Sequence, residues 1–363
     1  MAGLSLGAIL GYGQVDPRSP MAASWDLHGY LAMAAAVPGL ARGVPAPFAY
    51  RLLGPYLAGL LPLAGPVAFR ILSLVVGTGL AVALFGYLQS EGIGRRAAAW
   101  TAVFFPLNWP LFGCLVWNPF QLDDLLVLPA YLALLWALPR RRWGVFALAL
   151  LAGALARETA LLLVPVSLVF LLENRRWREE MGRWALAVLP GIAAFVLVRL
   201  LVPVAPGPET GGLAYYPGAL ARHVVYATYA EVWAGRLVWS FVPFLTLPLV
   251  FPETTREVFA GGKWRLLLLA LIAASTVWAR DPDRLMAPAF AVFFWLVAKI
   301  VDRHLARSPA ALALLALGAL LAYSTHLFGR DPLPSAPLPL ALNLAAVAVV
   351  TAAAYRCRRA EAQ

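Results

Sequence analysis

Long apolar runs alternate with short polar connections along almost the whole of this chain. A helix needs roughly 20 mainly apolar residues to cross a bilayer, and its backbone groups must be satisfied within the segment. The pattern therefore predicts an all-α, polytopic transmembrane helical bundle of about 11 to 12 spans. The predicted spans are residues 1–14, 66–88, 98–116, 122–138, 143–156, 159–172, 184–203, 234–251, 264–279, 286–301, 309–327 and 338–354.

Two connections are much longer than the others, and both fall on the same side of the predicted membrane. Residues 15–65 form the first external loop, whose apolar but proline-interrupted stretches predict helices that lie in the membrane interface. Residues 204–233 form a second long external loop, with a Pro/Gly-rich start and an aromatic-rich helix. Neither loop is large enough to be an independent soluble domain. Residues 1–363 are therefore interpreted as a single transmembrane domain.

The first apolar run, residues 1–14, is short for a span, and no basic residue precedes Arg18. It is therefore a poor signal peptide, and we expect the true start of the protein to lie upstream. Gly3, Gly7 and Gly11 have the small-xxx-small spacing that permits close packing between helices.

Positive charge is distributed unequally between the two sets of alternate connections. One set carries 18 of the 29 Lys and Arg residues against eight acids, whereas the opposite set carries 11 against ten. Cytoplasmic loops are enriched in Lys and Arg. The basic set is therefore predicted to be cytoplasmic, and the long loops external or periplasmic, in an inner or plasma membrane.

The composition agrees with the membrane class. Hydrophobic residues make up 62% of the chain and charged residues 13%, and the mean hydropathy is +0.76. A net charge of +11 suggests nucleic-acid binding in a soluble protein, but here the surplus lies in short loops beside spans. Membrane lipids, and not nucleic acid, are therefore the expected partners. The only two cysteines, Cys114 and Cys357, provide neither a disulfide framework nor a cysteine metal site.

Three short motifs lie on the predicted external face. They have the forms D-x-x-x-Y-x-x-x-A, P-F-x-Y-R-x-L-x-P and R-E-T-A-L-L-L-x-P. The matching residues are Asp26, Tyr30 and Ala34; Pro47, Phe48, Tyr50, Arg51, Leu53 and Pro55; and Arg157, Glu158, Thr159 and Pro165. Together with the topology, the motifs make the chain resemble bacterial integral-membrane glycosyltransferases of the GT-C superfamily.

This resemblance implies a function and a set of site residues. In that superfamily the sugar donor is a polyprenyl-linked phosphate or pyrophosphate, the site faces away from the cytoplasm, and an acid in the first external loop is essential. Asp26 matches this acid, and Tyr30, Arg51, Arg157 and Glu158 are expected to bind substrate. The expected partner is a lipid-linked sugar donor, and the oligomeric state stays open.

The chemistry of the residues also favours Asp26. Inverting transfer of a glycosyl group needs a base for the proton of the acceptor hydroxyl, and a carboxylate at the interface can serve. If residues 21–36 are helical, Asp26 and Tyr30 share one face while His28 points nearly opposite. Two alternatives stay open. Asp26 only caps or solvates an interfacial helix, or Asp16, interpreted as a turn residue, is the essential acid.

Asp123 and Asp124 open the predicted span 122–138. The resemblance places an acid of the second external loop at the site, sometimes through a metal, so this pair is the second catalytic candidate. Neighbouring residues of a helix diverge by about 100°, so at most one is expected to face the substrate. The alternative is stabilisation of a helix N-terminus. Because the first loop has no D-x-D spacing, a divalent cation is compatible with the site but not implied.

Arginine suits phosphate binding because its planar guanidinium donates paired hydrogen bonds. The candidates on the external face are Arg51, Arg157, Arg284, and Arg222 with its neighbour His223. Arg157 is the most constrained, since it lies in an apolar hairpin where an unpaired charge is costly. Its alternative role is a structural ion pair with Glu158 or another acid.

Three functions from different classes fit this chain. The first is a glycosyltransferase that moves a sugar from a polyprenyl-linked phosphate donor to an acceptor on the non-cytoplasmic face, with inversion. Since no sizeable C-terminal soluble domain follows the spans, a lipid, glycan or small acceptor is favoured over a peptide. The second is a non-catalytic protein of the same fold, or a polysaccharide polymerase or ligase. The third is a transporter, which should show broken helices, mid-membrane charges and a two-fold repeat. Mid-span charges are scarce and no repeat stands out.

Overall fold

The computed structural model of the protein consists of helices and their connections. It describes residues 2–17, 19, 27–174, 177–205, 218, 220–221, 227–278, 282–328 and 336–363. Within these ranges no strand occurs apart from an isolated parallel bridge between Pro45 and Ala205, which confirms the all-α prediction for this part of the chain. The chain divides into two compact units. Unit 1 comprises Met1–Tyr12, Thr78–Cys114 and Thr228–Gln363, and unit 2 comprises Gly13–Gly77 and Leu115–Ala227.

Six segments of the described residues are long and apolar enough to cross a membrane. They are Gly65–Ser90, Pro119–Ala137, Trp177–Leu201, Arg284–Leu305, Pro309–Leu327 and Pro337–Glu361. Two bent pairs, Arg95–Leu107 with Trp109–Trp117 and Pro252–Ala260 with Lys263–Ser275, raise the number to as many as eight. The structure therefore supports a multi-pass membrane protein. The larger expected number of spans included shorter helices, such as the 14-residue Trp143–Ala156, which at 1.5 Å per residue is shorter than the roughly 30 Å hydrocarbon core.

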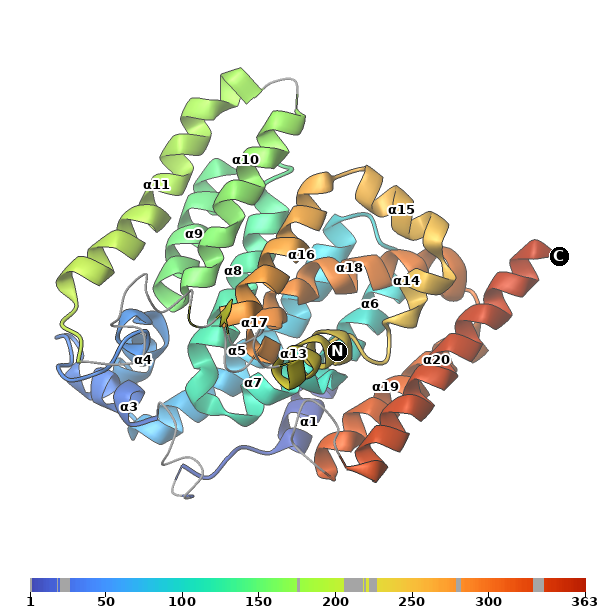
Figure 1. Ribbon diagram of the computed structural model, residues 1–363, viewed down its shortest axis with the longest axis horizontal. Coiled ribbons are helices and arrows are strands. Elements are labelled where there is room, and N and C mark those ends of the chain that lie inside the picture. The colour runs from blue at the N-terminus through green and yellow to red at the C-terminus, as the bar shows by residue number, and fades with distance from the viewer. Residues whose placement is uncertain are drawn as a thin grey trace. The chain divides into compact units, whose positions relative to one another are not determined.

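Unit 2 contains a row of neighbouring helices together with the first loop. Its elements are α3 (Leu27–Ala36), η1 (Phe48–Tyr50), α4 (Leu53–Gly59), the start of α5 (Gly65–Ser90), α7 (Cys114–Trp117) at the boundary with unit 1, η4 (Pro119–Gln121), α8 (Leu122–Ala137), α9 (Trp143–Ala156), η5 (Glu158–Leu162), α10 (Leu163–Glu173) and α11 (Trp177–Leu201). In Figure 1, α9 lies between α8 and α11, and it contacts both. Phe146 and Leu150 of α9 are fully buried, so this short apolar helix lies inside the unit.

The described part of the first loop contains two short helices. The C-terminal part of the helix predicted at 21–36 is confirmed as α3, with Tyr30 buried and His28 exposed on different faces. Asp26 lies outside the described residues. α3 and α4 contact each other, and both are too short to cross a membrane. Tyr30 and Phe69 belong to the hydrophobic core of unit 2, so the loop is packed into that unit. Its position at a membrane interface stays a prediction.

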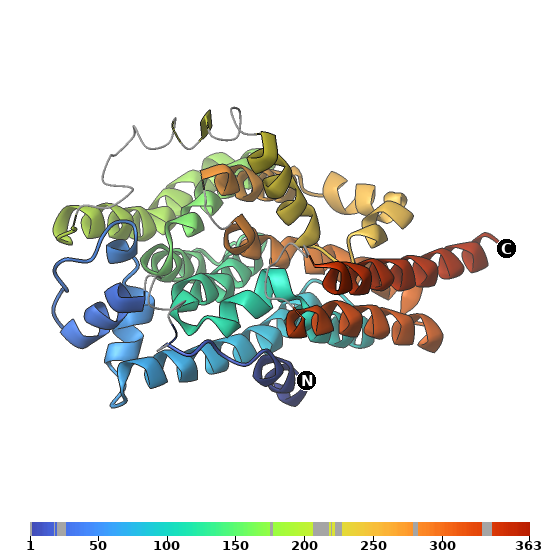
Figure 2. The same cartoon turned by 60° about the horizontal axis from the view of Figure 1, so that its bottom comes forward.

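Unit 1 has its own core of aromatic side chains. Its elements are α1 (Ala2–Tyr12), the end of α5, α6 (Arg95–Phe104), η2 (Phe105–Leu107), η3 (Trp109–Gly113), α13 (Ala227–Trp239), α14 (Thr246–Val250), α15 (Pro252–Ala260), α16 (Lys263–Ser275), η7 (Thr276–Trp278), α17 (Pro282–Met286), η8 (Ala287–Ala289), α18 (Phe290–Ile300), η9 (Val301–Leu305), α19 (Pro309–Ser324), η10 (Thr325–Leu327) and α20 (Pro337–Ala362). The rings of Phe104 and Phe244 stack with centroids 5.0 Å apart, and those of Phe105 and Phe290 at 4.7 Å. α19 and α20 lie side by side in Figures 1 and 2.

Two predicted spans are not continuous straight helices. The prediction at 234–251 is wrong as a single helix, because α13 ends at Trp239 and α14 begins at Thr246. Pro243 lies between them and has no backbone N–H to donate. The stretch predicted at 98–116 bends by 68°. The helix predicted at 264–279 begins as α16, and a bend of 100° separates it from α15, which was predicted to lie in a connection. Unit 1 therefore contains broken helices that the sequence interpretation treated as regular spans.

The break at 98–116 is organised by Asn108. Its side chain accepts a hydrogen bond from the backbone N–H of Leu111 at 2.8 Å, which caps the following helical turn. The same side chain donates to the carbonyl oxygens of Ser240 at 3.2 Å and Val242 at 3.1 Å. Because Asn108 is buried, these bonds satisfy backbone groups that the helix break and the interruption after α13 leave unpaired.

Ion pairs join several of the connections that were assigned to the basic face. In unit 1, Arg265 pairs with Glu91 at 3.6 Å and Arg358 with Glu253 at 3.3 Å. In unit 2, Arg141 pairs with Glu180 at 3.5 Å across the two connections that flank α9 and α10. Within each unit, connections that the charge pattern places on one face therefore lie together. The orientation of that face toward the cytoplasm stays a prediction.

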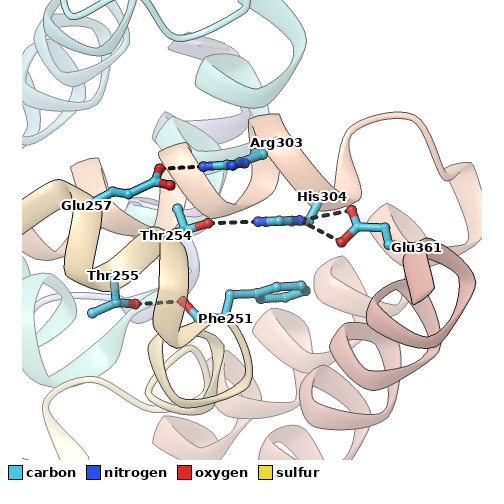
Figure 3. Close-up of polar contacts among 7 residues, drawn as sticks. All are labelled: Phe251, Thr254, Thr255, Glu257, Arg303, His304 and Glu361. Carbon is cyan, nitrogen blue, oxygen red and sulfur yellow. Dashed lines mark hydrogen bonds and ion pairs between the residues drawn. The ribbon is translucent and has the colours of Figure 1, made fainter.

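His304 of η9 links two further segments in unit 1, as Figure 3 shows. Its Nε2 lies 2.8 Å from Oγ1 of Thr254 in α15, and its Nδ1 lies 2.8 Å from a carboxylate oxygen of Glu361 in α20. The ring of Phe251 stacks on the imidazole with centroids 4.2 Å apart. These contacts hold the C-terminal end of α20 beside α15.

Candidate functional site

Asp123 and Asp124 lie in the first turn of α8, and both are almost fully buried, with exposed fractions of 2% and 3%. The chain before them is fixed locally, because Asn118 Oδ1 accepts a hydrogen bond from the backbone N–H of Phe120 at 3.1 Å. A helix N-terminus favours negative charge, which was the alternative role for this pair. Acids that only serve this purpose are ordinarily solvated, so their burial calls for specific partners.

Asp124 forms an ion pair with Arg157, whose exposed fraction is 6%. Arg157 lies between α9 and η5 with an extended backbone, φ −158° and ψ 137°. The hairpin is therefore a tight turn and not one kinked helix. Of the two pairings considered from the sequence, with Glu158 or with another acid, the structure shows Asp124 as the ion-pair partner.

Asp123 has a different partner, as expected for neighbours on a helix. Its Oδ1 accepts a hydrogen bond of 2.7 Å from the backbone N–H of Gly54 in α4. A Cβ added to Gly54 would lie 2.8 Å from this oxygen, so the approach depends on glycine. The other oxygen, Oδ2, is buried and has no hydrogen-bond partner among the described residues. Asp123 therefore attaches the first loop to α8 and keeps one oxygen able to accept a further hydrogen bond.

Arg51 makes a second link, from the first loop to the hairpin. Its Nη2 donates to Oε1 of Glu158 at 3.2 Å, and its guanidinium lies 5.6 Å from the centre of the Phe48 ring. The Arg51 side chain is 6% exposed, whereas that of Glu158 is 31% exposed. The Nε of Arg51 has no hydrogen-bond partner in the described part of the chain. Arg51 is thus a buried cation with a donor left for another group.

The charges of this second pair stabilise each other. Burial alone would lower the pKa of Arg51, but the Glu158 carboxylate and the Tyr30 phenol hold that pKa above its ordinary value. Burial alone would raise the pKa of Glu158, but Arg51 and Arg157 lower it to about 2. Both groups are therefore charged at neutral pH.

Six residues that the sequence singled out thus come together in unit 2: Tyr30, Arg51, Asp123, Asp124, Arg157 and Glu158. They come from the first loop, the start of α8 and the α9–η5 hairpin, all of which were assigned to the external face. Arg51, Arg157 and Glu158 lie within electrostatic range of Asp123. These connections therefore meet within this unit, and their role as a functional site stays a prediction.

The cluster accounts for only some of the predicted site residues. Asp26, Arg222 and His223 lie outside the described residues. Arg284 lies in α17 of unit 1, whose structure is described separately. Their roles in a common site therefore stay predictions.

Two contributors were missed from the sequence. Gly54 occupies a variable position of the motif P-F-x-Y-R-x-L-x-P, where its lack of a side chain lets Asp123 approach. Tyr131 of α8 donates to the carbonyl oxygen of Thr159 at 2.6 Å and is fully buried, which holds the hairpin against α8. The role of Gly54 was indicated in the sequence by a glycine directly before a proline in a motif. Nothing in the sequence indicates the role of Tyr131.

The cluster offers arginine donors to an anionic ligand, and both arginines are ion-paired with carboxylates. Within the described ranges, no group of three or more His, Cys, Asp or Glu side chains is placed to hold a metal ion. The cluster has two buried arginines, which match phosphate oxygens. It also has carboxylates able to orient a hydroxyl or accept its proton.

Comparisons with protein-family models, curated proteins and solved structures found no match to this chain.

Proposed function

We propose that this protein is a membrane glycosyltransferase that moves a sugar from a polyprenyl-linked phosphate donor to an acceptor on the non-cytoplasmic face. The observation that carries the proposal is the meeting of Arg51, Asp123, Asp124, Arg157 and Glu158 in unit 2. Ionisable groups buried in a membrane protein are costly and mark functional sites. Here they come from two of the three motifs that resemble the GT-C superfamily and from the start of α8.

In this proposal the arginines bind the donor phosphate. Arg51 is the better placed of the two, because its Nε has no hydrogen-bond partner among the described residues and its partner Glu158 is 31% exposed. Nε is buried, so a phosphate oxygen reaches this donor only when the side chains around it move, while Nη2 stays with Glu158. Arg157 adds positive charge at the same place while it neutralises Asp124.

The transfer itself needs a base for the acceptor. The acceptor hydroxyl oxygen attacks the anomeric carbon, the bond from that carbon to the phosphate oxygen breaks, and the lipid phosphate leaves as an anion. The hydroxyl proton passes to a carboxylate, for which we propose Asp26. Attack opposite the leaving group inverts the anomeric centre. Asp123, held by Gly54, positions the first loop, which carries Asp26 in its sequence.

A transporter is the second candidate, because the structure contains the broken helices that transporters often use. The two bends of 68° and 100° both lie in unit 1, and interrupted helices with buried charges occur at transport sites. The buried charges of unit 2 instead lie at the start of α8 and in the adjacent turns, which favours a site at the edge of the membrane. A flux assay with a lipid-free sugar distinguishes the two functions.

The proposal is tested by purifying the protein in lipid nanodiscs and measuring release of polyprenyl phosphate from a panel of polyprenyl-phosphate sugars. We expect release by the wild type and a loss of at least about 100-fold in Asp26→Asn, as for removal of a general base. Asp16→Asn tests the alternative acid, because Asp16 is exposed and its carbonyl oxygen closes a turn with Ser19. Loss of release in Asp16→Asn but not in Asp26→Asn would make Asp16 the base. Equal turnover by wild type and Asp26→Asn would remove Asp26 from the reaction. Flux of a free sugar without lipid-phosphate release would favour the transporter.

A further inference from the structure

One end of unit 2 lies far from the charged cluster and gathers tryptophan and arginine side chains. Two of the segments long enough to cross a membrane, Pro119–Ala137 and Trp177–Leu201, belong to this unit. The end of the first and the start of the second lie together, because Arg141 pairs with Glu180 at 3.5 Å. The 16 residues of α8 separate this place from Asp123, which corresponds to about 24 Å along the helix. We call it the tryptophan-rich end of unit 2.

Four half-buried tryptophans give this end its name. They are Trp136, Trp143, Trp177 and Trp184. The Nε1 of Trp143 donates to Glu180 Oε2 at 2.6 Å, and the Nε1 of Trp184 donates to Ser167 Oγ at 2.9 Å. Tryptophan is enriched where a membrane meets water, because its ring is apolar and its N–H is polar. Their position at the ends of two candidate spans is therefore typical of the level of lipid headgroups.

The buried carboxylate of Glu180 fixes two arginines at this end. It lies 3.5 Å from Arg141 and 3.8 Å from Arg183. Arg141 has a left-handed backbone with φ of 53°, which is uncommon for a residue other than glycine. The ion pair with Glu180 helps to hold this turn. The next residue, Arg142, is exposed.

Exposed arginines flank this fixed group. The Arg183 side chain is 72% exposed although it pairs with Glu180, and the guanidinium of Arg178 lies 5.3 Å from the centre of the Trp177 ring. Neither Arg142 nor Arg178 forms an ion pair with another described residue. At this end the described arginines are Arg140, Arg141, Arg142, Arg178 and Arg183, and the described acids are Glu173, Glu179 and Glu180. The tryptophan-rich end is therefore positively charged.

An exposed apolar strip continues from these arginines along α11. Leu186 is 71% exposed and lies one turn after Arg183, so the two side chains share a face of the helix. Leu189, Leu197 and Leu200 are exposed further along. A helix that starts with cations and continues with an apolar strip matches a ligand with an anionic head and apolar chains.

We propose that the tryptophan-rich end of unit 2 binds an anionic phospholipid. Its phosphodiester lies against Arg142, Arg178 and Arg183, and its acyl chains lie along the exposed leucines of α11. Guanidinium groups donate paired hydrogen bonds to phosphate oxygens, and basic residues beside a span attract anionic lipids. Free phosphate lacks the chains that the strip would hold. This inference does not rest on the proposed transferase function, which concerns the other end of α8.

The proposal is tested by titrating the purified full protein, in a neutral detergent, with phosphatidylglycerol or phosphatidylcholine. Native mass spectrometry measures the affinity for the first lipid bound. We expect the wild type to bind phosphatidylglycerol at least about tenfold more tightly than phosphatidylcholine. The double variant Arg142→Gln with Arg178→Gln should lose at least about tenfold in affinity for phosphatidylglycerol and keep its affinity for phosphatidylcholine.

The matched control is Arg95→Gln with Arg96→Gln, which removes two exposed arginines from unit 1. It changes the net charge equally and should keep the affinity for phosphatidylglycerol. Equal losses in the two double variants would overturn the proposal, because overall charge would then explain the binding. Equal affinities of the wild type for the two lipids would overturn it as well.

Salt provides a test that needs no substitution. The wild-type preference for phosphatidylglycerol should largely disappear when the salt concentration rises from about 0.1 M to about 1 M, because the screening length falls from about 10 Å to about 3 Å. A preference that is unchanged at about 1 M salt would contradict binding by exposed arginines.

Discussion

Asp124 of α8 and Arg157 of the α9–η5 hairpin form an ion pair, and both side chains are almost fully buried. This pair is the buried part of the cluster. In the second pair, Arg51–Glu158, the Glu158 side chain is partly exposed. The two pairs therefore differ in what their loss should do. Loss of the first is expected mainly to destabilise the fold, and loss of the second mainly to affect a ligand.

Asp124→Asn should destabilise unit 2 strongly. The substitution leaves the buried charge of Arg157 without its carboxylate, and breaking a buried ion pair on one side costs about 3–5 kcal/mol. The double variant Asp124→Leu with Arg157→Met removes both charges and should recover much of this loss. Thermal unfolding of the purified proteins measures both effects. A single variant as stable as the wild type would show that the pair contributes little.

Gly54→Ala should weaken the attachment of the first loop to α8. The new Cβ would lie 2.8 Å from Asp123 Oδ1, so the carboxylate must move away and the hydrogen bond from the Gly54 N–H is lost. We expect a loss of about 1–3 kcal/mol. Gly144→Ala in α9 is the control, because nothing lies within 4 Å of its new Cβ, and alanine favours a helix by roughly 0.5–1 kcal/mol. Equal stability of the two variants in thermal unfolding would contradict the importance of this contact.

The stabilisation by Glu158 should depend on pH. Burial alone would raise its pKa, but Arg51 and Arg157 lower it to about 2, below the usual value of about 4.3. A carboxylate with a lowered pKa stabilises the folded state above the ordinary pKa and loses this effect as pH falls through the folded value. Because the side chain is 31% exposed, we expect Glu158→Gln to cost on the order of 1 kcal/mol at neutral pH.

This cost should shrink as pH falls from about 4.5 to about 2. Melting temperatures of wild type and Glu158→Gln across that range provide the measurement. A difference between the two proteins that is independent of pH would mean that the carboxylate charge does not stabilise the fold.

Thr254→Val should loosen the end of α20. The Thr254 hydroxyl is the partner of His304 Nε2 (Figure 3), and leaving a partly buried ring nitrogen without a partner costs about 1–3 kcal/mol. Thr255→Val is the matched control, since among the described residues that hydroxyl bonds to the backbone carbonyl oxygens of Pro248 and Phe251 in its own segment. Proteolytic release of the C-terminal segment should increase in Thr254→Val alone. Equal release of the C-terminal segment in both variants would show that the contact between Thr254 and His304 does not hold the end of α20.

The chain's helical class and the members of the cluster could be predicted from the sequence, because they depend on local patterns. Apolar runs identify membrane helices, and an arginine in an apolar hairpin requires an acid. Which acid it meets could not be predicted, since Asp124 and Asp123 are neighbours with different partners, Arg157 and Gly54. That choice depends on how α8 is rotated about its axis. The hydrophobic pattern of the sequence does not fix this rotation closely enough to separate two neighbouring residues.

The broken helices were missed for a related reason. Apolar composition alone does not distinguish a straight span from a bent one. In the stretch predicted at 98–116 the break depends on Asn108, whose side chain reaches carbonyl oxygens of Ser240 and Val242 more than a hundred residues away. An asparagine between Pro106 and Pro110 indicates a break, but its distant partners appear only in the folded chain.

The most direct test of the central claim, that the unit 2 cluster binds the donor phosphate, is an exchange of the Arg51 and Glu158 side chains. The double variant Arg51→Glu with Glu158→Arg keeps the ion pair but moves the guanidinium from the first loop to the hairpin. We predict that the exchanged protein still folds, because the ion pair is kept, and that its affinity for a polyprenyl-phosphate sugar is at least about tenfold weaker. Saturable binding with unchanged affinity in the exchanged variant would contradict the claim and leave the pair a structural role.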